Sequence, residues 1–183
     1  VPCVLSAIIG LWVSKGFGVP VTAFDLQGVP NLTPLTLAQA IGMGVLFALV
    51  SILFCRVMHA APKIYDRFLP HPMARAAVGG AVVIGLTFLV WIWNPGTYDY
   101  NGAGAGVIHA AIGGTARPEA FLLKMLFTAV TLGAGFKGGE IVPVFFTGAT
   151  FGCTVAPLLG LHPSFGAGLG MVSVFCGVTN CPL

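Results

Sequence analysis

Long apolar stretches, interrupted by short polar ones, run along the whole chain. A helix that crosses roughly 30 Å of hydrocarbon needs about 20 mostly apolar residues, because each residue adds a rise of about 1.5 Å. Residues 35–58 and 73–93 reach that length, and the first of them carries no charge before Arg56. We therefore predict two membrane-spanning helices. The first helix either ends near Met58 or continues to Leu69 as an interfacial extension kinked at Pro62.

The remaining apolar stretches are shorter or are broken by glycine and proline. They cover residues 1–13, 102–112, 120–134, 140–161 and 164–178. The first is the tail of a helix, which an extended connection over residues 17–34 joins to the first span. Short, interrupted segments in succession are typical of discontinuous membrane helices whose ends meet near the bilayer midplane. Small residues also allow these helices to approach closely, among them Gly148, Gly152, Gly166 and Gly170.

Composition decides the broad class of protein. Hydrophobic residues make up 57% of the 183 residues and charged residues only 7%, whereas soluble domains carry roughly 25% charged residues. A water-soluble globule of this size cannot hide so much apolar surface, so we predict an all-α, multi-pass membrane protein in a lipid bilayer. The net charge is +3 and the eight basic residues form no dense run, which gives no support to nucleic-acid binding.

The basic residues gather between the two predicted spans. Arg56, Lys63, Arg67 and Arg75 lie there, against a single acidic residue, Asp66. A short connection rich in lysine and arginine usually faces the cytoplasm, so we expect this end of both helices on that side.

Neither a metal site nor a catalytic constellation is visible in the sequence. The five cysteines form no C-x-x-C pair and the four histidines have no ligand spacing, so we predict no metal and no cofactor. No pairing of a nucleophile with a base stands out, which makes an enzyme the least expected class.

The segment from Gly133 to Pro143 carries the most specific pattern in the chain. Four glycines within residues 133–139 break the preceding helix, and Pro143 suits the first turn of the next one, where its missing N–H is not needed. We therefore predict that the next helix begins near Glu140, with its first N–H groups free of internal partners. These groups, and a helix dipole worth about half a positive charge, favour an anion.

Partial charges of this kind suit passage through a membrane. Several amides hold a dehydrated anion without a cationic side chain, whereas a full positive charge would hold it too tightly for release. The alternative is a re-entrant loop in which the glycines serve packing alone. The residues by themselves leave both interpretations open.

Residues 139–143, Gly-Glu-Ile-Val-Pro, resemble the G-x-F-x-P signature of the CLC family of chloride channels and proton-coupled anion exchangers. Residues 145–152 resemble the helix that follows this signature. Residues 174–183 resemble the stretch that ends in A-P-L before the next family helix. The resemblance implies a partial CLC-type fold, with several tilted spanning helices and broken, re-entrant helices.

The resemblance also assigns roles within the glycine-rich segment. It implies that the backbone amides of Glu140 and Ile141 coordinate the anion. Ile141 stands where the signature has an aromatic residue, and Glu140 where it has an apolar one. A Gly-Gly-Glu start resembles a bacterial branch that includes fluoride/proton exchangers, so chloride and fluoride are both expected ions. The residues that would shape the turn are Gly138, Gly139, Val142 and Pro143.

At the level of the whole protein, the resemblance implies transmembrane transport of chloride or fluoride, by a channel or by an anion/proton antiporter. It implies a homodimer with one pathway per subunit in a bacterial cell membrane. We expect residues 1–183 to be a single transmembrane fragment of a larger anion-transport domain, truncated at both ends, with the gating residues outside it. Two alternatives are another broken-helix secondary transporter for a different anion and a membrane scaffold that transports nothing.

Two further residues have competing interpretations. Glu140 is either a carboxylate favoured by the helix N-terminus or a titratable group near the pathway. In the second case it is turned away, paired with Lys137, or protonated when the ion is present. We expect Lys124 and Arg117 to mark the end of a helix rather than a pathway.

Overall fold

The computed structural model describes residues 2–19 and 24–180, and every regular element in those ranges is a helix. The elements are α1 (Pro2–Gly16), α2 (Pro34–Phe68), α3 (Pro72–Trp93), α4 (Ala105–Ile112), α5 (Ala120–Gly133), α6 (Ile141–Val155), the 3₁₀ helix η1 (Ala156–Leu159) and α7 (Pro163–Thr179). By length and composition, α2, α3 and the continuous stretch Ile141–Leu159 can cross a membrane. The prediction of an all-α protein is confirmed.

The longest helix, α2, has a well-defined start. Pro34 occupies its first position, and the preceding Thr33 caps it through a reciprocal pair of bonds with Thr36. The helix continues through Pro62 to Phe68, so of the two predictions the longer one is correct. At 35 residues it is about 52 Å long, well beyond the roughly 30 Å of a hydrocarbon core.

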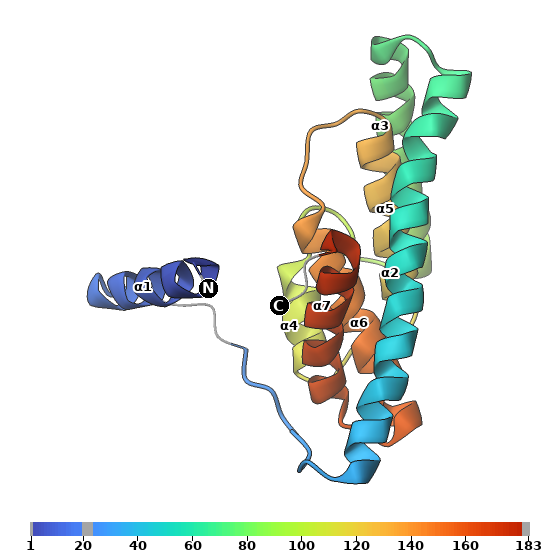
Figure 1. Cartoon of the computed structure of the whole chain (residues 1–183). Coiled ribbons are helices and arrows are strands. Elements are labelled where there is room, and N and C mark those ends of the chain that lie inside the picture. The colour runs from blue at the N-terminus through green and yellow to red at the C-terminus, as the bar shows by residue number, and fades with distance from the viewer. Residues whose placement is uncertain (1, 20–23, 181–183) are drawn as a thin grey trace.

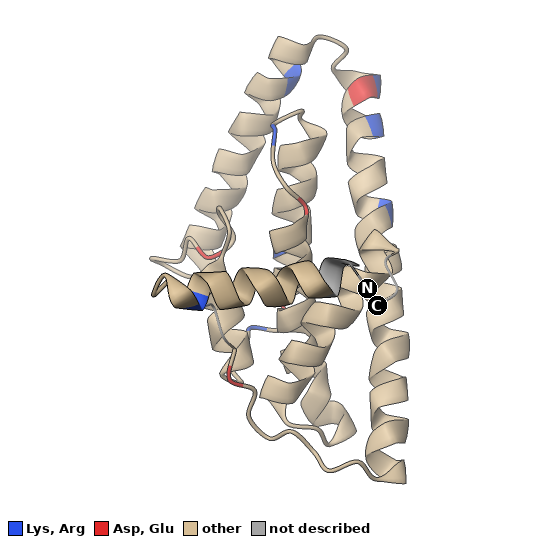
Figure 2. Cartoon of the chain, turned by 60° about the vertical axis from the view of Figure 1, so that its left-hand side comes forward, with Lys and Arg blue, Asp and Glu red and all other residues tan. Residues whose placement is uncertain are grey.

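The connection between α2 and α3 is shorter than the charge pattern suggested. Only residues 69–71 separate the two helices, so all four lysine and arginine residues expected in the connection lie on helices instead. Figure 2 shows charged ribbon segments on α2 and α3 near the end where the two helices are joined, and further charged segments on other elements at lower levels. The charges of residues 63–75 thus lie toward the joined end of α2 and α3.

Helices α6 and α7 lie side by side, next to α2 (Figure 1). Glycines bring them together: a Cβ atom on Gly152 would collide with the carbonyl oxygen of Gly166, and one on Gly148 with that of Gly170. The predicted close approach through small residues is confirmed at these two crossing points. Here the glycines serve packing.

The start of α6 lies partway along the length of α2. Figure 1 shows the chain leaving the far end of α5, returning as an extended segment, and entering α6 at a level well within the length of α2. Helix α1 stands apart from the other helices in the same view. A helix that begins at this depth is what the interrupted apolar pattern predicts.

Candidate anion site

The turn before α6 is built by glycine and ended by proline. Helix α5 ends at Gly133, and Gly135 has φ of +94°, a left-handed conformation that residues with a side chain rarely adopt. Glu140 is the N-cap residue, α6 begins at Ile141, and Pro143 lies in its first turn. The predicted helix start near Glu140 is confirmed.

The first backbone N–H groups of α6 are unpaired. The first bond of the helix runs from Val144 N to Glu140 O, at 3.0 Å, and no side chain caps the N-terminus. Within the described residues, no hydrogen bond is donated by the N–H of Glu140, Ile141 or Val142. These donors and the positive end of the helix dipole therefore point to the same place.

The turn is open on the side that these amides face. Gly138, Gly139 and Glu140 are exposed, and Ile141 is 54% exposed. A Cβ atom built on Gly139 would meet nothing within 4 Å. Pro143, by contrast, is buried and fixes the first turn of α6 against the bundle.

A cavity of about 370 Å³ lies beside this turn. Gly138, Gly139 and Pro143 line one part of it, and residues of α5 from Lys124 to Leu132 line another. A third part is formed by residues 100–102, which precede α4. Three of the six predicted site residues, Gly138, Gly139 and Pro143, therefore line one cavity, whereas Glu140, Ile141 and Val142 lie outside its lining.

Comparison with known proteins decides the family. The family model described as voltage gated chloride channel matches residues 1–183, the whole chain. The chain belongs to the CLC family. It is 34% identical over 186 residues to a chloride/fluoride channel protein of Pseudomonas syringae pv. tomato, a match that covers 100% of this chain and 40% of the relative.

A solved structure agrees with this assignment. The crystal structure of a CLC-type fluoride/proton antiporter superposes on the CLC chain with a TM-score of 0.82 and 29% sequence identity, over 91% of this chain and 41% of the other. The predicted partial CLC-type fold is confirmed. The CLC chain spans about two fifths of the length of both relatives. The part of the A-P-L-like stretch at residues 181–183 lies outside the described residues.

Lys124 overturns one prediction made for the CLC chain. It does not mark a helix end: it lies in the second turn of α5 and is only 2% exposed. Its ammonium group donates hydrogen bonds to the carbonyl oxygens of Tyr100, at 3.1 Å, and Gly102, at 2.6 Å. It also lies 5.1 Å from the centre of the Phe146 ring. The sequence feature that could have revealed this position is the lone charge within an apolar segment, because a charged residue inside a membrane segment is usually functional.

Glu140 and Lys137 show no ion pair. Both are exposed, and the one ion pair found in the described part of the chain joins Arg75 to Asp66. Of the alternatives given for Glu140, the pair with Lys137 is therefore not found in the described structure. Three residues apart but on either side of the glycine turn, they lack the helical geometry that would hold them together.

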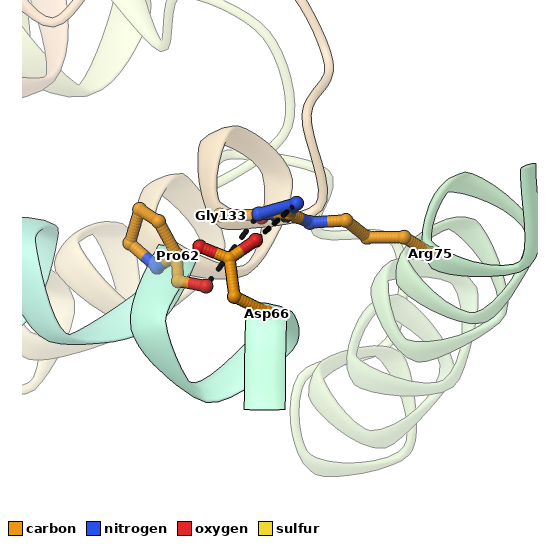
Figure 3. A network of polar contacts seen from close by, with 4 residues as sticks. All are labelled: Pro62, Asp66, Arg75 and Gly133. Carbon is orange, nitrogen blue, oxygen red and sulfur yellow. Dashed lines mark hydrogen bonds and ion pairs between the residues drawn. The ribbon is translucent and has the colours of Figure 1, made fainter. Parts of the chain in front are cut away.

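Arg75 anchors the end of α5, where the turn begins (Figure 3). Its Nε–H donates to the carbonyl oxygen of Gly133 at 3.1 Å, and Nη2 to that of Pro62 at 3.5 Å. Its Nη1 also pairs with Asp66 at 2.7 Å. One guanidinium therefore connects α2, α3 and α5 and satisfies a carbonyl at a helix C-terminus.

Proposed function

We propose that this CLC chain is part of a membrane protein that transports small inorganic anions, chloride or fluoride, and that the amides of Glu140 and Ile141 bind the anion. The observation that carries the proposal is the unpaired N-terminus of α6, which begins at an open glycine turn partway along the length of α2. Unpaired N–H groups are costly where water is scarce, and an anion satisfies them.

Each residue of the turn has its own part in this proposal. Gly138 and Gly139 keep side chains away from the ion, and Pro143 starts the helix at the required depth. Val142 contributes a third free N–H on the same turn. Binding by partial charges is weak enough for the ion to leave, which transport requires.

The names of the relatives support the choice of ions. One is described as a chloride/fluoride channel protein and the other as a fluoride/proton antiporter. We propose that fluoride is carried in preference to chloride and is exchanged for protons. The complete protein would be a multi-pass homodimer in a bacterial cell membrane, and residues 1–183 a transmembrane fragment of its transport domain.

Flux measurements with the full-length protein test this function. Purified protein would be reconstituted into liposomes loaded with fluoride or with chloride, and efflux would be recorded with ion-selective electrodes, with and without a pH gradient. We expect fluoride efflux that exceeds chloride efflux and that pumps protons against their gradient. Absence of flux for both ions would overturn the proposal and would favour a scaffold.

A further inference from the structure

The buried ammonium group of Lys124 has no anionic partner in the described part of the chain. No Asp or Glu lines the cavity beside it, and the one ion pair described lies at Arg75. Its contacts are two backbone carbonyl oxygens and the face of Phe146. Carbonyl dipoles compensate only part of the cost of removing a full charge from water, which favours a counter-ion.

The ammonium group also has a donor to spare. A lysine side chain carries three N–H donors, and the carbonyls of Tyr100 and Gly102 accept two bonds. Lys124 itself lines the cavity of about 370 Å³. One N–H is therefore left for a group inside that cavity.

The other polar side chains of α5 in this cavity do not supply such a donor. The hydroxyl of Thr128 donates to the carbonyl oxygen of Lys124, and that of Thr131 to the carbonyl oxygen of Phe127, both at 2.7 Å. With their hydrogens engaged, both oxygens present acceptors, which suit water or a protonated species rather than an anion. Lys124 is thus the one cationic side chain among the lining residues.

The cavity connects the lysine to the glycine turn. Its α5 lining extends from Lys124 to Leu132, eight residues or about 12 Å along the helix axis. Gly138 and Gly139 line the same cavity, and a Cβ atom on Gly138 would lie 3.2 Å from the Leu132 side chain. A small ion can therefore contact Lys124 without leaving the cavity that also borders the glycine turn.

We infer that the cavity between Lys124 and the glycine turn is a second binding site for a small inorganic anion, with the Lys124 ammonium as its charged donor. The inference rests on the proposed function, because it gives the transported ion a station in the cavity that Gly138 and Gly139 border. The two sites differ in kind: the amides offer partial charges and the lysine a full one. The hydrogen bonds to the carbonyl oxygens of Tyr100 and Gly102 hold the ammonium group in place, so that it does not bind the ion too tightly for release.

Anion binding to the purified full-length protein tests the inference. Potassium fluoride and potassium chloride would be titrated calorimetrically, and the anion-dependent rise of the unfolding temperature would be recorded in parallel. Lys124→Met keeps an unbranched apolar side chain of similar length but removes the charge, and with it the contact of the ammonium group with the Phe146 ring. We expect it to weaken anion binding about tenfold or more, and Lys124→Arg to retain affinity within about threefold.

The matched control is Lys63→Met, which removes one positive charge from an exposed position on α2. It should leave anion affinity unchanged. If Lys124→Met binds the anion like the wild type while unfolding at a lower temperature, the lysine only holds the loop and the inference is overturned.

A second variant covers the case in which Lys124→Met does not fold. Thr131→Leu leaves the lysine and its carbonyl contacts in place and fills part of the cavity from a half-buried position. We expect about fivefold weaker anion binding, and wild-type affinity would overturn the inference. If the wild type neither binds nor transports either ion, the proposed function fails as well. If these variants transport the anion and bind it with wild-type affinity, the second site is refuted and the proposed function stands.

Discussion

Glycine has opposite roles in two neighbouring regions of this CLC chain. In the turn before α6, Gly139 faces open space, and a Cβ atom there would meet nothing within 4 Å. At the crossing of α6 and α7, a Cβ atom on Gly152 would collide with the backbone of Gly166. In our proposal, glycine in the first region lets a ligand approach the amides, whereas in the second region it lets another helix approach. The same residue type thus borders open space in one place and makes a packing contact a few turns away.

The largest effect is expected at the helix crossing. Gly152→Ala forces α6 and α7 apart, because the obstacle is backbone rather than a mobile side chain. We expect the free energy of unfolding to fall by about 3 kcal/mol. Thermal or denaturant unfolding of the full-length protein in detergent measures this, with Gly85→Ala on the open side of α3 as the control. Wild-type stability of Gly152→Ala would show that the two helices are not in close contact.

A smaller loss of stability is expected at the base of the turn. Arg75→Met removes the donor to the carbonyl oxygen of Gly133 and the connection between three helices. Because a hydrogen bond from a charged donor to a half-buried carbonyl is lost, we expect the free energy of unfolding to fall by about 2 kcal/mol. Arg67→Met, at an exposed position near the end of α2, is the control. An equal change in both variants would mean that the Gly133 contact contributes nothing.

A substitution in the open turn should weaken anion binding and hardly change the stability of the protein. Gly139→Val places a side chain in front of the free amides without a clash inside the described chain. We expect anion affinity and flux to fall about tenfold, equivalent to about 1.4 kcal/mol, with an unfolding temperature close to that of the wild type. Gly85→Val is the matched control for a new side chain in open space. Unchanged affinity would show that Gly139 does not border an anion site.

The smallest effect belongs to the acidic partner of Arg75. Asp66 is 65% exposed in its side chain, and an ion pair in water is screened and contributes little. We expect Asp66→Asn to lower the free energy of unfolding by about 0.5 kcal/mol or less, with the difference vanishing at high salt. A loss comparable to that of Arg75→Met would show that the ion pair, and not the bond to Gly133, anchors the turn.

The order of the helices and the start of α6 were predictable because they depend on local rules. Apolar length identifies spans, and glycine followed by proline ends one helix and begins the next. The position of Lys124 was not predictable in the same way. A lone lysine in an apolar stretch is compatible with a helix end. Only the fold shows that the carbonyl oxygens of Tyr100 and Gly102 accept hydrogen bonds from its ammonium group.

The sequence by itself determined the class of protein, the helical elements and the glycine turn that precedes the helix start at Glu140 and Ile141. Each follows from interactions between residues close together in the chain. Tertiary structure alone decided which glycines pack against another backbone, how Arg75 reaches Gly133, and that Lys124 opens onto the cavity beside the turn. The physical reason is that helix periodicity specifies which residues share a face, but the neighbour that covers each face comes from a distant part of the chain.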